Sequence, residues 1–293
     1  MGLVQDIARS MRPQQWTKNL LVFAAILFAG KAGDAEAVGE VLVGFAAFCL
    51  LSGATYLLND SLDAAQDRQH PEKCDRPIAA GRIPVHEGLL LAVFFGLLGL
   101  VMSYFITWGF FITAALYLVL TTAYSLWLKH IVILDVLAVS LGYVVRAVAG
   151  AAAISVEISP WLIICTLLLT LFLALAKRRG ELVQLEEGAI HYRKILDEYS
   201  PQLLDQMIAV VTASTVVAYC LYTVDERTLQ VVGTHNLVYT VPLVIYGIFR
   251  YLYLMHEKKL GDHPDQLLLT DGPLLLTVAL YAAAVGVILY FIP

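Results

Sequence analysis

The residues whose types suit chemistry lie in one polar segment, NDSLDAAQDRQHPEKCDRPIAAGRIP, which runs from Asn59 to Pro84 between two apolar stretches. Asn59, Asp63 and Asp67 are spaced at i, i+4 and i+8, so on a helix they would share one face, with Asp60 beside them. Carboxylates this close repel unless a cation lies among them, and oxygen-only ligands suit Mg²⁺, which takes further oxygens from substrate phosphates. We therefore predict a Mg²⁺-diphosphate site in which these four residues are the metal ligands and the three aspartates are catalytic.

Four cations that follow the aspartates are expected to neutralise phosphate oxygens that the metal does not reach, namely Arg68, Lys73, Arg76 and Arg82. We expect Asn59 to contact the substrate as well. The alternative is an ordinary solvated helix face on which the acids pair with neighbouring cations. The preceding run, VLVGFAAFCLLSGATYLL, places the acids at a membrane boundary, where charged groups are expensive, and this favours the functional interpretation.

The composition assigns the chain to a class. Of 293 residues, 59% are hydrophobic and 15% are charged, which indicates an all-α, polytopic membrane protein. The apolar run after the N-terminal arm lacks a signal-peptidase pattern. The four cysteines show no CxxC spacing, so neither a disulfide framework nor a zinc site is expected. We expect no nucleic-acid partner, and a homo-oligomer stays open.

The elements that must position the acids are apolar runs long enough to cross a bilayer. We predict nine spans in a single domain covering residues 1–293, at 19–35, 39–58, 86–105, 108–128, 131–153, 159–176, 204–223, 236–255 and 273–292. Gly30 and Lys31 interrupt the first of these spans.

Lysine and arginine are distributed asymmetrically between the two sides of such a bundle. With the N-terminus inside, the cytoplasmic segments and adjoining helix ends hold Arg9, Arg12, Lys18, Arg68, Lys73, Arg76, Arg82, Lys129, Lys177, Arg178, Arg179, Arg193, Lys194, Arg250, Lys258 and Lys259. The opposite side keeps Lys31 and Arg227. The asymmetry predicts a topology with the N-terminus inside and the C-terminus outside. The membrane is expected to be the cytoplasmic membrane of a bacterium or an archaeon. The long loops at 59–85 and 177–203 then place the active site on the cytoplasmic face.

The two remaining polar motifs lie on that same side. The amphipathic N-terminal arm, residues 1–18, leads into RPQQWTKN at 12–19, where Arg12 and Lys18 are candidates to hold the phosphate of an anionic lipid headgroup. The alternative is that Trp16 is an interfacial anchor and Lys18 only sets the topology. The loop after the sixth span begins KRRGEL. Its candidate substrate-binding residues are Lys177, Arg178, Glu181, Tyr192 and Arg193, although a positive-inside stop signal explains the cations nearly as well.

Two ionisable residues lie inside predicted spans. Asp135 is one turn from the cytoplasmic end of its span, whereas Arg146 lies deeper in the same span. Such residues normally face the bundle interior and have partners, so we expect structural roles or positions in a cavity wall.

With nine spans, the motif at Asn59 to Asp67 and a second polar motif after the sixth span, the whole chain resembles the UbiA superfamily of intramembrane prenyltransferases. The RPxQWxKN arm, the DRxHPxKxxRPIAAGxI stretch at 67–83 and the KRRGEL segment are similar to the branch of decaprenyl-phosphate phosphoribosyltransferases. In place of the second Asp-rich motif of typical members, this chain has Lys177 to Glu181. The resemblance implies Mg²⁺ as cofactor, phosphoribosyl diphosphate (PRPP) as donor, a polyprenyl phosphate such as decaprenyl phosphate as acceptor, and a role in cell-wall synthesis.

Two other functions remain open. A UbiA-type enzyme that moves a prenyl group from a prenyl diphosphate to an aromatic acceptor would be expected to carry a second Asp-rich motif. An ion or metabolite transporter would be expected to show paired halves with interrupted helices, and no internal repeat is evident.

Overall fold

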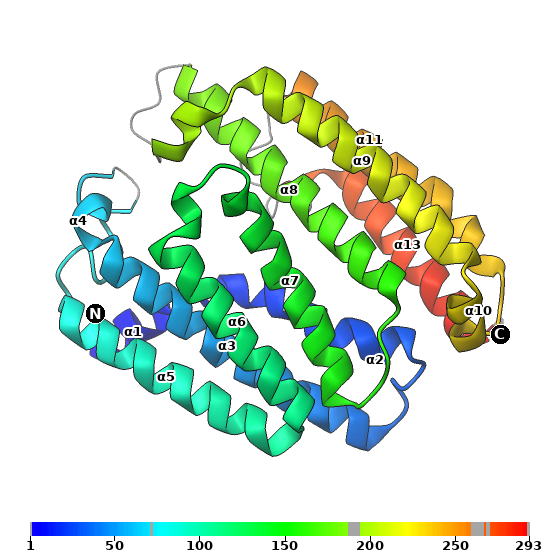
Figure 1. Ribbon diagram of the computed structural model, residues 1–293, viewed down its shortest axis with the longest axis horizontal. Helices are drawn as coiled ribbons and strands as arrows, with labels where there is room; N and C mark the ends of the chain where they lie inside the picture. Colours follow the sequence, from blue (N-terminus) through cyan, green and yellow to red (C-terminus); the bar gives the residue numbers. More distant parts are fainter. Residues whose placement is uncertain (1, 71–72, 187–193, 259–266, 268–269, 292–293) are drawn as a thin grey trace. The chain divides into compact units, whose positions relative to one another are not determined.

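The computed structural model describes the chain except residues 1, 71–72, 187–193, 259–266, 268–269 and 292–293, and every regular element among the described residues is helical (Figure 1). The elements are α1 Leu3–Ser10, η1 Pro13–Phe23, α2 Ala24–Phe28, α3 Ala35–Leu62, α4 Ala64–Asp67, α5 Val85–Ile106, α6 Trp108–Leu126, η2 Leu128–His130, α7 Leu134–Ala153, α8 Pro160–Glu186, η3 Lys194–Glu198, α9 Pro201–Val224, α10 Glu226–Val232, η4 Asn236–Thr240, α11 Val241–Glu257 and α13 Gly272–Phe291. The predicted all-α membrane fold is confirmed. Eight of the described helices are long and apolar enough to cross a membrane.

The chain forms two compact units. The first unit contains residues 1–27, 31–129 and 141–158, and the second contains 28–30, 130–140 and 159–293. Helix α7 therefore begins in the second unit and continues into the first.

Helix α3 is the central helix of the first unit, and 61% of its most apolar 18-residue stretch is buried. It packs against α5, α6 and η1. Small residues on α5 allow this close packing, because a Cβ on Gly99 would lie 2.8 Å from the Leu51 side chain and one on Gly88 would lie 2.6 Å from the Ser61 hydroxyl. At about 1.5 Å per residue, the 28 residues of α3 reach roughly 42 Å, more than the hydrocarbon thickness of about 30 Å. Its acidic C-terminal turn can thus lie in the polar region of the membrane.

The first predicted span, 19–35, is not one α-helix. The structure has instead the 3₁₀ segment η1 followed by the five-residue helix α2. A 3₁₀ helix rises about 2.0 Å per residue, so η1 and α2 together still reach roughly 30 Å. Gly150 of α7 contacts η1 so closely that a Cβ would lie 2.0 Å from the Val22 carbonyl oxygen. The irregular segment is therefore fixed by tight packing within the first unit.

In the second unit, α8 packs against α9, and α11 packs against α13 (Figure 1). Phe172, Leu175 and Leu204 are fully buried in the largest core cluster of this unit. Ser200 caps α9 by accepting a hydrogen bond from the Leu203 N–H. Helix α8 extends to Glu186, so the first ten residues of the loop expected at 177–203 are helical.

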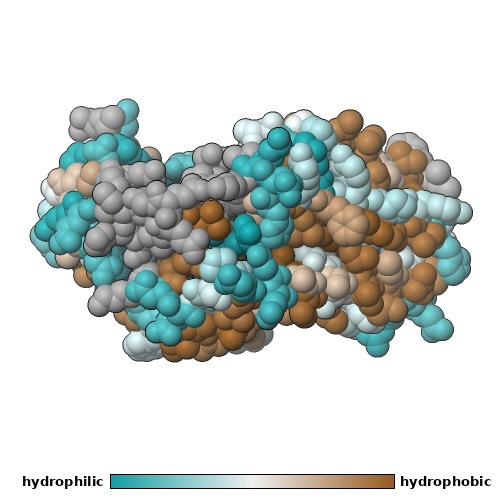
Figure 2. Space-filling view, turned by 90° about the horizontal axis from the view of Figure 1, so that it is seen from above, coloured by the Kyte–Doolittle hydropathy of each residue, from teal (hydrophilic) through white to brown (hydrophobic). Residues whose placement is uncertain are grey.

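Apolar side chains cover much of the visible surface, shown in brown in Figure 2. Many of the exposed apolar side chains belong to helices α5 and α6. Only 17% of the most apolar stretch of α5 and 22% of that of α6 is buried. Apolar surfaces of this kind face lipid, so the protein is an integral membrane protein with several membrane-spanning helices.

Candidate functional site

The acidic motif lies where α3 ends. The helix stops at Leu62, Asp63 is its C-cap, and Asp67 is the last residue of the short helix α4. The single helix face predicted for these acids is therefore interrupted. The turn stays nearly helical, because the Asp63 N–H donates to the Asn59 carbonyl and the Asp67 N–H donates to the Asp63 carbonyl, each at 2.9 Å.

Asp60 and Asp67 are buried and share one guanidinium. Arg76 Nη1 lies 3.1 Å from Asp60 Oδ1 and 2.6 Å from Asp67 Oδ2, and the two carboxylate side chains are 2% and 7% exposed. Asp60 also binds Arg12, whose Nη2 lies 2.5 Å from the same oxygen. Two carboxylates removed from water in this way need cations near them, and the chain itself provides these cations.

Arg12 is fixed in an unusual position. Its backbone is left-handed, with φ 51° and ψ 65°, and its guanidinium stacks 4.8 Å from the centre of the Tyr56 ring. The left-handed backbone of a non-glycine residue costs about 1–3 kcal/mol. The contacts of the guanidinium with Asp60 and Tyr56 stabilise Arg12 in this conformation. The sequence suggested a lipid headgroup as the partner of Arg12 and did not predict that it pairs with Asp60 of the acidic motif.

Asp63 pairs with a different cation. The Lys129 ammonium, carried by η2, lies 2.7 and 2.9 Å from the two Asp63 carboxylate oxygens and 3.5 Å from Asn59 Oδ1. The Lys129 side chain is only 9% exposed. Lys129 was not predicted to belong to the site. The signal for it in the sequence is a lysine between two long apolar runs, because a cation in such a place needs an anionic partner.

The other predicted phosphate ligands in this unit are more peripheral. Arg68 Nε donates to the Ala79 carbonyl at 3.1 Å, so it organises the segment that carries Arg76. Arg82 binds Asp6 of the N-terminal arm at 3.0 Å. Lys18 is half-buried and Lys73 is partly exposed, and both have interactions of their own.

The second unit contains the other polar cluster. Arg178, predicted to bind substrate, is buried, and its Nε donates to Asp135 Oδ2 at 2.8 Å. The same guanidinium donates to Glu181 at 2.6 Å, and the Tyr199 hydroxyl donates to Asp135 Oδ1 at 2.7 Å. Burial raises the pKa of Tyr199 to about 12, so its phenol stays protonated at physiological pH. Asp135 is fully buried and thus has the structural partner that its sequence position predicted.

The same phenol stabilises a strained turn. Tyr199 Oη accepts a hydrogen bond from the Ile133 N–H at 2.7 Å, and Ile133 is left-handed with φ 71°. A β-branched residue is rarely found in this conformation. The cluster of Asp135, Arg178 and Tyr199 therefore holds the turn that leads into α7.

The rest of the second motif is divided between surface and interior. Arg179 pairs with Asp205 at 2.5 Å on the more exposed side, and Lys177 lies beside it in the sequence with interactions of its own. Tyr192 and Arg193 lie outside the described residues.

Comparison with known proteins decides the family. The model of the UbiA prenyltransferase family matches residues 20–269 of this chain. The chain belongs to the UbiA prenyltransferase family. It is therefore an enzyme, a transferase of the membrane.

Curated relatives of this UbiA-family chain show which branch of the family it resembles. It is 33% identical over 300 residues to decaprenyl-phosphate phosphoribosyltransferase of Mycolicibacterium smegmatis, which covers 99% of this chain and 94% of that protein. It is 31% identical to the protein of the same name from Corynebacterium glutamicum, over 100% of this chain and 89% of that protein. A UbiA homolog from Archaeoglobus fulgidus, solved with GPP and Mg²⁺, shares the fold with a TM-score of 0.73 and 19% identity, covering 97% of this chain and 99% of that one.

The donor set of the acidic motif suits the metal bound by that homolog. Asn59, Asp60, Asp63 and Asp67 offer only oxygen ligands, the type that Mg²⁺ prefers. In this structure the carboxylates are turned toward Arg12, Arg76 and Lys129, and the described residues contain no group of three or more His, Cys, Asp or Glu side chains gathered around one point. The motif thus fits Mg²⁺ in chemistry, with cations of the chain as its present partners.

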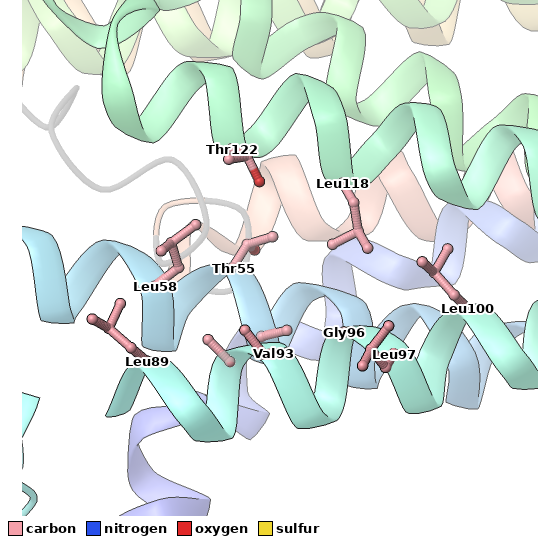
Figure 3. Close-up of a pocket in the computed structure, with 11 residues that line it drawn as sticks. Thr55, Leu58, Leu89, Val93, Gly96, Leu97, Leu100, Leu118 and Thr122 are labelled. Atoms are coloured by element: carbon pink, nitrogen blue, oxygen red, sulfur yellow. The ribbon is translucent and has the colours of Figure 1, made fainter. Parts of the chain in front are cut away.

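An apolar groove lies on the first unit beside this site. Its volume is about 280 Å³, and the view in Figure 3 shows Leu58, Leu89 and Val93 along one part, with Leu118 and Thr122 of α6 opposite. None of the acidic residues lines it. Since Val93 and other walls of the groove are exposed on a lipid-facing helix, the groove opens toward the bilayer.

Proposed function

We propose that this UbiA-family enzyme transfers 5-phosphoribose from PRPP to a polyprenyl phosphate, such as decaprenyl phosphate, and releases diphosphate. The observation that carries the proposal is the composition of the acidic site, in which three buried or half-buried cations surround three carboxylates. A donor with a diphosphate and a separate 5-phosphate, used with an anionic acceptor, requires more positive charge than one prenyl diphosphate. The names of the relatives that cover the whole chain support the same donor and acceptor.

Asn59, Asp60, Asp63 and Asp67 would hold Mg²⁺ in this reaction. When bound, the metal neutralises charge on the diphosphate and makes it a better leaving group. With the carboxylates on the metal, the cations that now pair with the acids would be available to donate to phosphate oxygens.

Three side chains are placed for that exchange. Arg12 and Arg76 contact Asp60, and Lys129 contacts Asp63. Each is a donor without acceptor capacity, so each can turn from a carboxylate to a phosphate without losing its hydrogen bond. Arg68 and Lys73 are predicted to bind the phosphates from the more exposed side, and Lys177, Arg178, Glu181, Tyr192 and Arg193 form the second predicted substrate-binding set.

The bond changes need no general base. The bond between ribose C1 and the diphosphate oxygen breaks as C1 develops positive charge, and an oxygen of the lipid phosphate forms a bond to C1 from the opposite face. A phosphate monoester is already anionic near neutral pH, so no proton has to be removed from the nucleophile. The contribution of the protein is orientation and fixed charge in a site from which water is largely excluded.

The site is proposed to face the cytoplasm, with the N-terminus on the same side. The supporting feature is the lysine and arginine asymmetry of the sequence, which places the acidic motif and the KRRGEL segment on one side.

Label transfer tests this function. Purified protein is incubated with Mg²⁺, PRPP labelled in the ribose and a polyprenyl phosphate, and the lipid phase is counted. We expect label in the lipid only when all components are present. Label transfer that requires a prenyl diphosphate and an aromatic acceptor instead would contradict the proposal and assign the chain to the prenyl-transferring branch.

A further inference from the structure

Arg146 is a buried cation whose hydrogen bonds all go to neutral groups. Its Nε donates to Asn19 Oδ1 at 2.8 Å, its Nη1 donates to the Gly142 carbonyl at 3.0 Å, and its Nη2 donates to the Tyr117 hydroxyl at 2.8 Å. The guanidinium also lies 4.6 Å from the centre of the Tyr117 ring and 5.4 Å from that of Tyr143. The residue is 6% exposed and lies in the middle of the membrane-spanning helix α7.

No carboxylate of the described residues lies within ion-pair distance of this guanidinium. Hydrogen bonds to Asn19 and Tyr117 satisfy the N–H donors of the guanidinium, but they do not cancel its full charge. Charged groups inside a membrane are normally paired, because an isolated one is costly. An arginine kept in this state indicates that its counter-ion arrives from outside the chain.

A second cation precedes Asn19 in the chain. Lys18 lies on η1 directly before Asn19, so the segment that places Asn19 against Arg146 also brings a second cation into this part of the unit. The neighbourhood of the Arg146 guanidinium thus differs from the acidic motif, since the acceptors of its hydrogen bonds are neutral groups. It suits an anion that binds without a metal.

The depth and the access route favour a lipid anion. Thr55, which lines the groove that opens toward the bilayer, donates a hydrogen bond to the Ser52 carbonyl, and the Ser52 hydroxyl accepts one from Asn19, the partner of Arg146. Figure 3 shows Thr55 on the α3 side of that groove. A substrate in the bilayer would therefore reach the Arg146 neighbourhood from the membrane side.

The distance between the Arg146 neighbourhood and the acidic motif is also consistent with an acceptor phosphate beside Arg146. Ser52 accepts a hydrogen bond from Asn19 and lies eight residues before Asp60 on α3, roughly 12 Å along the helix. A donor diphosphate at Asp60 and an acceptor phosphate below it would lie on opposite sides of the ribose carbon, as an in-line displacement requires.

We propose that Arg146 and Lys18 form a subsite for the phosphate monoester of the polyprenyl acceptor, in which the charge of Arg146 is the essential feature. This inference rests on the proposed function. Asn19 and Tyr117 are positioning residues that hold the guanidinium, and the incoming phosphate is its counter-ion.

Substitution of Asn19 separates charge from hydrogen bonding. Asn19→Asp keeps an acceptor at the Arg146 Nε but adds a permanent counter-ion, whereas Asn19→Ala removes the hydrogen bond and leaves the charge. We expect Asn19→Asp to weaken binding of labelled polyprenyl phosphate at least tenfold, measured without PRPP or Mg²⁺, and to raise its KM similarly while the KM for PRPP stays unchanged. Asn19→Ala should bind the lipid better than Asn19→Asp, although it should melt at a lower temperature.

Two controls sharpen the test. Asn236→Asp makes the same change of charge in the second unit and should bind the lipid as the unsubstituted protein does. Arg146→Lys should retain more lipid binding than Arg146→Gln. Unchanged lipid binding in Asn19→Asp, or a weakening equal to that of Asn19→Ala, would show that Arg146 is only structural and would overturn the inference.

The 5-phosphate of PRPP is the other phosphate monoester in the reaction. If Asn19→Asp weakened PRPP binding and left lipid binding intact, the subsite would belong to the donor and the inference would be wrong. Because the binding measurement uses the lipid alone, it decides this point even if label transfer from PRPP were to fail.

Discussion

Lys129 and Asp63 form a two-pronged ion pair, with the ammonium 2.7 Å from one carboxylate oxygen and 2.9 Å from the other. The lysine side chain is 9% exposed, so the carboxylate takes the place of water around the ammonium. In the proposed reaction Asp63 would be a ligand of Mg²⁺ and the ammonium of Lys129 would be a donor to a phosphate.

The carboxylates of Asp63 and Asp67 are expected to be essential for turnover. Asp63→Asn and Asp67→Asn should each lower label transfer into the lipid by at least about 100-fold, because an amide is a weaker metal ligand and leaves the proposed site short of negative charge. Asp34→Asn is the matched control, since asparagine replaces aspartate equally well at the N-cap of α3. Near-normal turnover in both site variants would refute the metal assignment.

Lys129 is expected to act on the phosphorylated donor. Lys129→Gln should raise the KM for PRPP and lower kcat, with a combined loss of about 10- to 1,000-fold, because a charge-assisted hydrogen bond to the leaving group is removed. Lys129→Arg should recover part of this loss. The measurement is steady-state kinetics with PRPP varied at saturating lipid, and a change confined to the lipid KM would speak against the assignment.

Mg²⁺ is expected to bind together with diphosphate at the acidic motif. Addition of both should raise the melting temperature of the purified protein, because a ligand that binds only the folded state stabilises it. EDTA should reverse the shift and stop label transfer. The Asp63→Asn variant should show little shift, and a full shift in that variant would place the metal elsewhere.

The cluster around Asp135 is expected to contribute to stability. Arg178→Met leaves a fully buried carboxylate with one phenolic donor, which should cost about 3–5 kcal/mol and lower the melting temperature. Combining it with Asp135→Leu removes both charges, so the double variant should melt above the single Arg178→Met variant. A double variant less stable than either single one would show that the pair itself is stabilising.

Tyr199 is expected to make the stability of the protein depend on pH only in the alkaline range. Its pKa is raised from 10.0 to about 12, so its contribution is complete below pH 10 and is lost as the pH rises through about 12. Melting temperatures measured between pH 9 and 12 should therefore fall less steeply in Tyr199→Phe. Identical slopes would show that Tyr199 does not titrate in this way.

Much of the fold was predictable because hydropathy and length decide membrane helices. The first span was the exception. Its sequence gives an apolar run near 19–35, but the 3₁₀ form of η1 depends on contacts with residues far away in the chain, such as Gly150. The hydropathy pattern of the sequence does not reveal contacts between residues that are far apart in the chain.

The site was predictable in its acids and less so in its partners. The spacing from Asn59 to Asp67 identified the motif, whereas the pairing of Asp60 with Arg12 joins residues 48 positions apart. Arg178 illustrates the same limit. Its neighbours in KRRGEL favour a surface role, but the structure places it in the interior with Asp135.

The left-handed turn at Arg12 has a consequence for engineering this enzyme. Glycine adopts that backbone conformation without strain, so Arg12→Gly would relax the turn while removing a guanidinium from the site. The same change takes one of two cations away from the buried Asp60 carboxylate, and breaking a buried ion pair costs about 3–5 kcal/mol, more than the strain that glycine would relieve. The strained turn is thus retained because the protein needs the guanidinium there for stability as well as for turnover.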